Sequence, residues 1–284
     1  MSQEPQTRPP IALAAFEGWN DAGDAATGVI THLCELWGAE PLVALDPEEY
    51  HDFQVNRPQV SITDDGTRRI TWPTTRLFRT RPQGYDRDVL LVHGIEPSMR
   101  WRRYTDEVLG HLAEQNVETL ITLGALLADV PHTRPIPVTS TSDNPELLDR
   151  LALQKSTYEG PTGIVGVLGD VATRRGLPVL SLWAAVPHYV GQPPSPKAQL
   201  ALLSRIEELL GLPVELAELA EDAQAWEHGV DELAGQDEEI AAYVKQLEEA
   251  KDTADLPEAS GEAIAREFER YLRRRGDQGK PGST

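Results

Sequence analysis

The chain has 284 residues, of which 40% are hydrophobic and 25% are charged, so it can bury the core of one large domain. Its formal net charge of −20, from 26 basic and 46 acidic residues, excludes nonspecific nucleic-acid binding and docking on an anionic membrane surface. The single cysteine, Cys34, excludes an internal disulfide, and its apolar helical surroundings predict a buried structural thiol.

The beginning of the chain does not have the pattern of a targeting segment. Met1–Pro10 is polar and contains proline, without the charged start and apolar run of a signal peptide. No apolar run in the sequence approaches the ~20 residues that a membrane span requires. We therefore expect a cytoplasmic protein, with residues 1–9 disordered.

The first part of the chain predicts strands, a helix and a hairpin. An apolar run at Ile11–Phe16 predicts a strand, and the helical spacing of apolar residues in Ala22–Trp37 predicts the helix that follows. Pro41–Leu45 is a second apolar run. The β-prone runs Gln59–Thr63 and Arg68–Trp72 flank an Asp-Gly turn, which predicts an antiparallel hairpin.

The middle of the chain alternates further strand and helix patterns. The predicted strands are Asp88–His93, Val117–Leu123 and Pro178–Trp183, and the predicted helices are Trp101–Glu114, Ile164–Thr173 and Lys197–Leu210. Most of the apolar runs lack polar alternation, which is typical of strands buried on both faces of a parallel sheet. The sequence therefore predicts an α/β fold over residues 10–212, with helices flanking a mostly parallel sheet.

The composition becomes strongly acidic from about residue 213. Glu215–Glu258 contains 15 acidic and 2 basic residues, which carry most of the chain's net charge. Apolar residues spaced alternately by three and four predict helices in this segment, with interruptions at Gly229 and Gly235. A last helix is expected at Ser260–Arg275, so that residues 213–275 form a helical segment and 276–284 a disordered tail.

Candidate site residues lie in the segment after the first strand. In an open α/β sheet, ligands bind at the carboxyl ends of the strands, where this segment places Glu17, Asn20, Asp21 and Asp24. Two interpretations stay open. The polar residues can cap the following helix, or they can bind a cation or a basic group, since three carboxylates would repel phosphate.

The segment after Asp88–His93 contributes Glu96 and Arg100. Arg100 belongs to a basic cluster that can hold an anion or pair with carboxylates. We favour ion pairs, with Glu17, Asp21 or Glu96 as the partners.

Two later loops add the remaining candidates. Asp129, His132 and Arg134 can form an acid–base set, although a loop histidine without an evident partner is more often structural. Glu159 precedes a glycine-rich helix start, near Gly163, that can act as a generic anion site.

Sequence motifs of known catalytic and cofactor sites are missing. The chain has no G-x-S-x-G elbow, no H-E-x-x-H motif, no Cys/His zinc set and no dinucleotide fingerprint. We therefore predict no catalytic residue, no metal and no cofactor.

Five segments stand out together: Ala15–Ala26, Gly94–Trp101, Leu123–Pro137, Tyr158–Gly166 and Pro187–Lys197. They resemble the corresponding segments of the PAC2 (proteasome assembly chaperone 2) family, in its actinobacterial branch, and the resemblance covers roughly residues 10–275. It implies a three-layer α/β/α core similar to the purine nucleoside phosphorylase type, a C-terminal helical extension and homo-oligomers.

The resemblance also implies a function. Family members act as chaperones in building the proteasome α-ring and are not enzymes, so proteasome α-subunits are an expected partner. The chain departs from the best-understood members at Lys280–Thr284, which lacks their C-terminal hydrophobic-Tyr-any motif. We therefore expect a non-enzymatic, oligomeric interaction module. The alternative is a small-molecule-binding protein or an enzyme of nucleoside phosphorylase or hydrolase type that uses the crevice at the strand ends.

Overall fold

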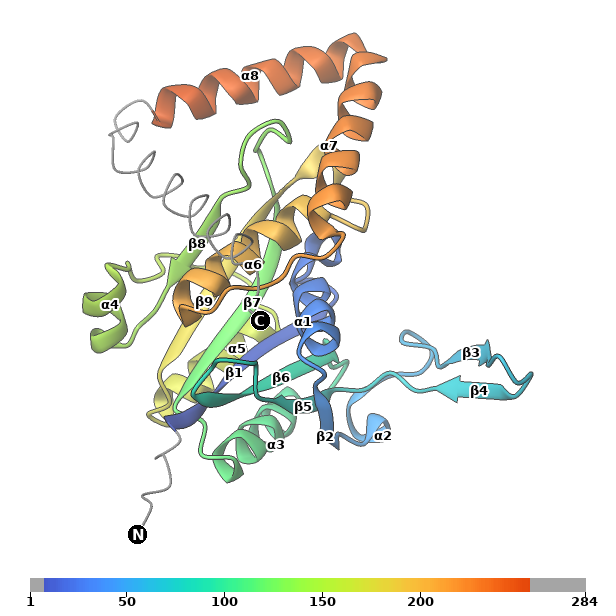
Figure 1. Ribbon diagram of the computed structural model, residues 1–284, viewed down its shortest axis with the longest axis vertical. Coiled ribbons are helices and arrows are strands. Elements are labelled where there is room, and N and C mark those ends of the chain that lie inside the picture. Colours follow the sequence, from blue (N-terminus) through green and yellow to red (C-terminus); the bar gives the residue numbers. More distant parts are fainter. Residues whose placement is uncertain (1–7, 256–284) are drawn as a thin grey trace, which may run out of the picture.

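The computed structural model describes residues 8–255 (Figure 1). The expected last helix at 260–275, the tail 276–284 and most of the expected disordered N-terminus lie outside the described residues. Of the stretch 1–9, residues 8 and 9 already belong to the first strand.

Within the described chain, seven strands form one mixed sheet in the order β2-β5-β6-β1-β7-β9-β8. The strands are β1 (Arg8–Glu17), β2 (Glu40–Ala44), β5 (Arg76–Thr80), β6 (Arg87–Ile95), β7 (Thr119–Ala128), β8 (Val138–Thr141) and β9 (Val179–Pro187). The central strands β6, β1, β7 and β9 run parallel, and the outer pairs are antiparallel. The predicted α/β fold is confirmed.

Helices cover both faces of the sheet (Figure 1). The 3-10 turn η1 (Ala22–Asp24), α1 (Ala25–Leu36), α4 (Pro145–Leu151) and α6 (Pro196–Leu210) lie on one face, and α2 (Pro47–Tyr50), α3 (Trp101–Glu114) and α5 (Ile164–Arg174) on the other. A short turn, η2 (His188–Val190), follows β9. Alternate residues of β1 belong to the two cores, with Leu13 in one and Ala14 in the other.

The strand predictions fail in part at the antiparallel edges. The run Pro41–Leu45 largely forms a strand, β2 (Glu40–Ala44), but four of the five residues of β2 are exposed, because it is an edge strand with one neighbour. The sequence reading missed β5, in which two arginines and one threonine interrupt the apolar pattern. Both strands lie outside the parallel centre of the sheet. The central strands are buried on two faces, and that burial produces their continuous apolar runs.

The predicted hairpin is confirmed as a separate two-stranded sheet that projects from the body of the molecule (Figure 1). Its strands are β3 (Gln59–Ile62) and β4 (Arg68–Thr71). Asp65 accepts a hydrogen bond from Thr67 N at 3.0 Å, and Gly66 has a φ of +80°, a conformation that glycine adopts without strain.

The acidic segment forms two long helices, α7 (Leu219–Gly235) and α8 (Glu238–Asp255), which we call the acidic arm. The prediction of an interruption at Gly229 is wrong, because α7 runs through it. One glycine costs about 1 kcal/mol in a helix, less than the packing of α7 on α6 supplies. The break falls after Gly235, where Asp237 accepts a hydrogen bond from Glu239 N at 2.9 Å. Within residues 8–255 no helix is long and apolar enough to cross a membrane.

Candidate functional site

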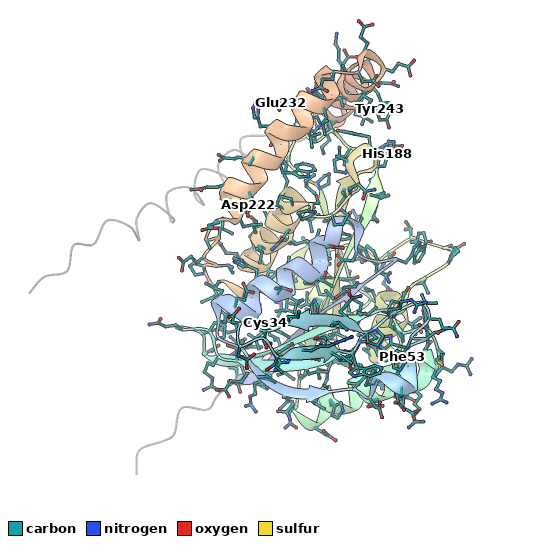
Figure 2. All side chains as sticks on the ribbon, turned by 90° about the vertical axis from the view of Figure 1, so that its right-hand side faces the viewer. Cys34, Phe53, His188, Asp222, Glu232 and Tyr243 are labelled. Atoms are coloured by element: carbon teal, nitrogen blue, oxygen red, sulfur yellow. The ribbon has the colours of Figure 1, made fainter. Side chains whose placement is uncertain are left out.

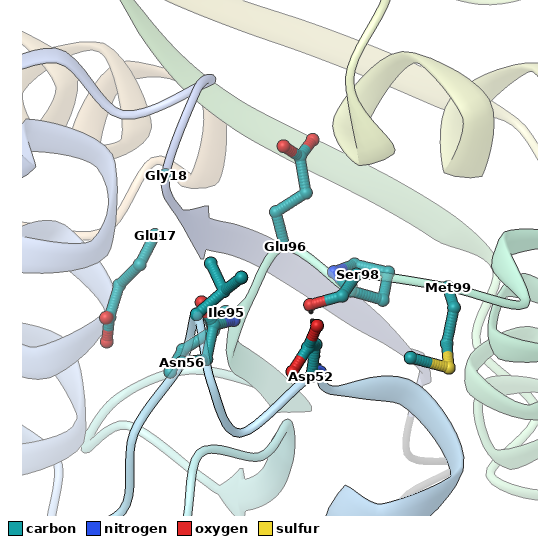
Figure 3. A pocket seen from close by; sticks show the side chains of 10 residues that line it. Glu17, Gly18, Asp52, Asn56, Ile95, Glu96, Ser98 and Met99 are labelled. Atoms are coloured by element: carbon teal, nitrogen blue, oxygen red, sulfur yellow. Dashed lines mark hydrogen bonds between the residues drawn. The ribbon is translucent and has the colours of Figure 1, made fainter.

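A hollow of about 440 Å³ opens where β1 and β6 end, at the carboxyl edge of the parallel strands (Figure 3). Ten described residues line it: Glu17, Gly18, Asp52, Val55, Asn56, Ile95, Glu96, Pro97, Ser98 and Met99. The predicted residues Glu17 and Glu96 both lie here. The sequence reading missed the wall formed by residues 52–56, because this segment follows α2 rather than a parallel strand.

Glu96 is held by two hydrogen bonds from distant parts of the chain. One of its carboxylate oxygens, Oε1, accepts from Asn20 Nδ2 at 2.9 Å and from Ile164 N at 2.8 Å. Ile164 N is at the start of α5, so the Glu96 carboxylate occupies the place that an anion would take at this helix N-terminus. A side chain at Gly163 would collide with Asn20. The predicted anion site near Gly163 is therefore filled by the protein itself.

Asp21 caps the helix that follows it, as one of the two open interpretations expected. Its Oδ1 accepts from Ala26 N at 2.6 Å and from Thr27 N at 3.3 Å, and its Oδ2 accepts from the Thr27 hydroxyl. Burial raises the pKa of Asp21 to about 6, although these hydrogen bonds lower it. Asp24, by contrast, is exposed. Asn20 is buried beneath Glu96 and does not cap the helix.

Glu17 is the half-buried carboxylate of the hollow. Burial, followed by the charges of Asp24 and Asp21, raises its pKa above the ordinary value. None of the ten lining residues is Lys, Arg or His. The hollow therefore favours a cationic or neutral group over phosphate, which would meet the carboxylates of Glu17, Asp52 and Glu96.

Arg100 forms an ion pair, as predicted, but its partner is different. It pairs with Glu49 of α2, which Arg103 also contacts at 2.9 Å, and not with Glu17, Asp21 or Glu96. The reason is where α2 packs. The backbone amides of Ser98 and Met99 donate to the carbonyl oxygen of Tyr50, and these hydrogen bonds bring α2 against the start of α3.

Asp129, His132 and Arg134 do not converge as an acid–base set, and they lie away from the hollow. β7 pairs with β9 as far as Ala128, whereas its pairing with β1 ends at Thr122, so β7 carries its loop beyond the hollow. The three side chains contact the acidic arm instead. The structural interpretation of His132 is the better one.

The arm is docked on this loop by hydrogen bonds. The fully buried His132 places Nε2 2.9 Å from Asp231 Oδ1 and Nδ1 2.8 Å from Tyr189 Oη. Arg134 donates to both oxygens of Asp252, at 2.8 and 2.9 Å.

Tyr243 of α8 makes a second set of contacts between the acidic arm and the α/β core. Tyr243 Oη donates to Asp129 Oδ1 at 3.1 Å, and the rings of His188 and Tyr243 meet edge to face, 5.5 Å apart (Figure 2). The last predicted residue, Glu159, is exposed and does not line the hollow.

Exposed apolar side chains line the hollow and follow it in sequence. Val55 and Met99 line it and Trp19 follows Gly18, and all three are exposed. We call the ten lining residues together with Trp19 the strand-end surface. No group of three or more His, Cys, Asp or Glu side chains in the described part of the chain is placed to hold a metal ion.

The fold and this surface together define a three-layer α/β protein with an open, acidic hollow at its strand ends. The family model of the PAC2 family matches residues 15–234, and the chain belongs to the PAC2 family.

Solved structures agree with this assignment. A PAC2 family protein from Streptomyces avermitilis is 55% identical, with a TM-score of 0.78, over 83% of this chain and 99% of its own. A Mycobacterium tuberculosis protein described as a proteasome-assembly chaperone homologue is 49% identical, with a TM-score of 0.75, over 82% and 99%. A Corynebacterium glutamicum protein of unknown function is 28% identical, with a TM-score of 0.79, over 88% and 94%. No curated protein matches the sequence.

Proposed function

We propose that this protein is a non-enzymatic, chaperone-like interaction module of the actinobacterial PAC2 branch, acting in the cytoplasm as a homo-oligomer. The proposed partners are proteasome α-subunits, bound at the strand-end surface. Support comes from the Mycobacterium tuberculosis relative, which is 49% identical and described as a proteasome-assembly chaperone homologue.

The observation that carries the proposal is that most of the predicted polar residues have structural contacts. Glu96 and Asp21 cap helices, and His132 and Arg134 dock the acidic arm. What remains at the strand ends is an open hollow with exposed apolar side chains around it. Interface centres are enriched in Trp and Met, and the carboxylates add attraction for a basic partner surface.

The test is a pull-down from the native cytoplasm with an N-terminal tag, read by mass spectrometry. We expect proteasome α-subunits to be enriched by the wild-type chain and lost with the double variant Trp19→Ala, Met99→Ala. Leu42→Ala is the matched control, because Leu42 is as exposed as Met99 but lies on the edge strand β2. Absence of α-subunits from the wild-type sample would refute the partner. Equal recovery by both variants would refute the surface.

A second candidate function is small-molecule binding in the hollow, favoured by its volume and by the raised pKa of Glu17. A ligand that binds the native state raises the melting temperature. This candidate predicts a rise with nucleosides or amines, none with phosphate, and loss of the rise in Glu17→Gln. A flat screen would remove it.

A further inference from the structure

The β3–β4 hairpin has one apolar face that the described chain leaves uncovered. Val60 lies opposite Ile70 and Ile62 lies opposite Arg68, so these four side chains share one face, since directly paired residues of an antiparallel ladder point the same way. The polar residues Gln59, Ser61, Arg69 and Thr71 form the other face. This alternation is the pattern of a strand pair that buries one side.

The apolar face is nevertheless in solvent. Val60, Ile62 and Ile70 expose 50%, 76% and 52% of their surface. A two-stranded hairpin is marginally stable by itself in water, and this one is anchored at its base, where the rings of Phe53 and Trp72 lie 4.9 Å apart. Figure 1 shows it projecting beyond the sheet, without a helix against it.

The hairpin does not share the strong negative charge of the chain. Residues 59–71 contain two arginines and two aspartates, and Arg57 precedes them, in a protein of net charge −20. Two copies of such a chain repel each other over most of their surfaces, and the hairpin, with Arg68 on its apolar face, is a place where contact with an acidic surface of another copy is electrostatically favourable.

The acidic arm offers the complementary surface. Residues 219–255 contain twelve acidic residues and two lysines. At the corner between α7 and α8, Leu233 is 61% exposed and Ile240 36%, and the exposed carboxylates of Glu232, Glu238 and Glu239 surround them. Figure 2 shows Glu232 on α7 near this corner. We call residues 232–240 the arm corner.

We propose that the apolar face of the hairpin docks on the arm corner of a second copy of this chain. The apolar side chains Val60, Ile62 and Ile70 cover Leu233 and Ile240, and Arg68, on the same face, meets the surrounding carboxylates. The hairpin and the arm corner are different parts of the chain, so each copy carries both halves of the contact. Repeating the same contact from copy to copy forms a closed ring, and making it twice between two copies forms a symmetric dimer. This inference deepens the homo-oligomeric part of the proposed function and rests on it.

The first experiment measures the molar mass of the full chain by sedimentation velocity and light scattering. The wild type is expected to be oligomeric. The variant Val60→Thr, Ile70→Thr keeps the β-propensity of both strands, and it is expected to raise the dissociation constant about tenfold or more. The matched control Ser61→Thr, Thr71→Ser changes the other face and leaves the mass unchanged. Circular dichroism and melting temperature verify that each variant is folded.

The second experiment uses charge exchange to test whether the hairpin contacts the arm corner of a second copy. Arg68→Glu and, separately, Glu238→Arg with Glu239→Arg are expected to weaken self-association about two- to fivefold, and their combination to restore it. A monomeric wild type, or equal effects of both hairpin faces, overturns the proposal. The proposal is also overturned if the hairpin variant Val60→Thr, Ile70→Thr dissociates the oligomer while the arm variant Glu238→Arg, Glu239→Arg has no effect. The apolar face of the hairpin would then pack on a different part of the second copy. A monomeric hairpin variant that still captures α-subunits separates self-association from partner binding.

Discussion

Asp21 combines a capping role with a buried position. Its carboxylate satisfies backbone amides at the start of α1, yet burial raises its pKa from an ordinary value of 3.8 to about 6. The folded state therefore holds a proton on Asp21 more tightly than the unfolded state does. The associated stability is fully present below about pH 4 and is lost as the pH rises through about 6.

This gives a prediction for the variant Asp21→Asn, which keeps an oxygen to accept from Ala26 N and does not ionise. Between about pH 4 and pH 7 the wild type should lose about 2–3 kcal/mol of unfolding free energy relative to the variant. Urea denaturation at several pH values measures the difference. Glu159→Gln, at an exposed position, is the control and should follow the wild type. Parallel pH profiles for Asp21→Asn and the wild type would contradict the assignment.

At the scale of elements, the acidic arm is attached through charged and aromatic side chains that reach the loop after β7. Arg134 contacts two acidic residues of α8, Glu248 at 3.2 Å and Asp252 at 2.8 Å, and Thr133 donates to Glu248 as well. α8 buries few apolar side chains, Val244 and Leu247 among them. Its docking therefore depends on these polar contacts more than that of α7 does.

We expect Arg134→Ala to release α8 while the sheet stays intact. Hydrogen exchange should become faster in residues 238–255 and remain unchanged in β1, because local opening is governed by the contacts of the element that opens. Arg174→Ala is a matched control, since Arg174 pairs with Asp170 within α5, far from the arm in sequence and on another element. Unchanged exchange in α8 would mean that its apolar contacts suffice.

At the scale of the whole molecule, the core does not end where the acidic composition begins. Val214 and Leu219 are buried in the same cluster as α1 and α6, and Ala223 is also buried. The boundary at 212/213 expected from the sequence stays a prediction, and this packing indicates that α7 stabilises the α/β core.

Two truncated chains test whether α7 stabilises the α/β core. A chain ending after Gln236 should unfold cooperatively with nearly the stability of the full protein. A chain ending after Gly211 loses the burial of Val214, Leu219 and Ala223 and exposes Ile206 and its neighbours, so its unfolding free energy should fall by more than about 4 kcal/mol. Guanidinium titrations compare the two. Equal stability of both chains would show that the core is independent of α7.

The sequence by itself determined the parallel strands, the hairpin, the main helices and the family. These features follow from local signals: continuous apolar runs, helical spacing and an Asp-Gly turn. It also determined that Glu17 and Glu96 lie at one end of the sheet, because parallel strands place their carboxyl ends together.

Only the tertiary structure decided the partner of each polar residue. Glu96 meets Ile164, 68 positions away, and His132 meets Asp231, 99 positions away. Arg100 had several acidic residues within reach by sequence, and the folding of α2 against α3 selected Glu49. Such pairings depend on strand order and on which helix covers which face, and hydrophobic periodicity carries no information on either. The tertiary structure therefore decided which predicted site residues face the hollow and which hold the arm.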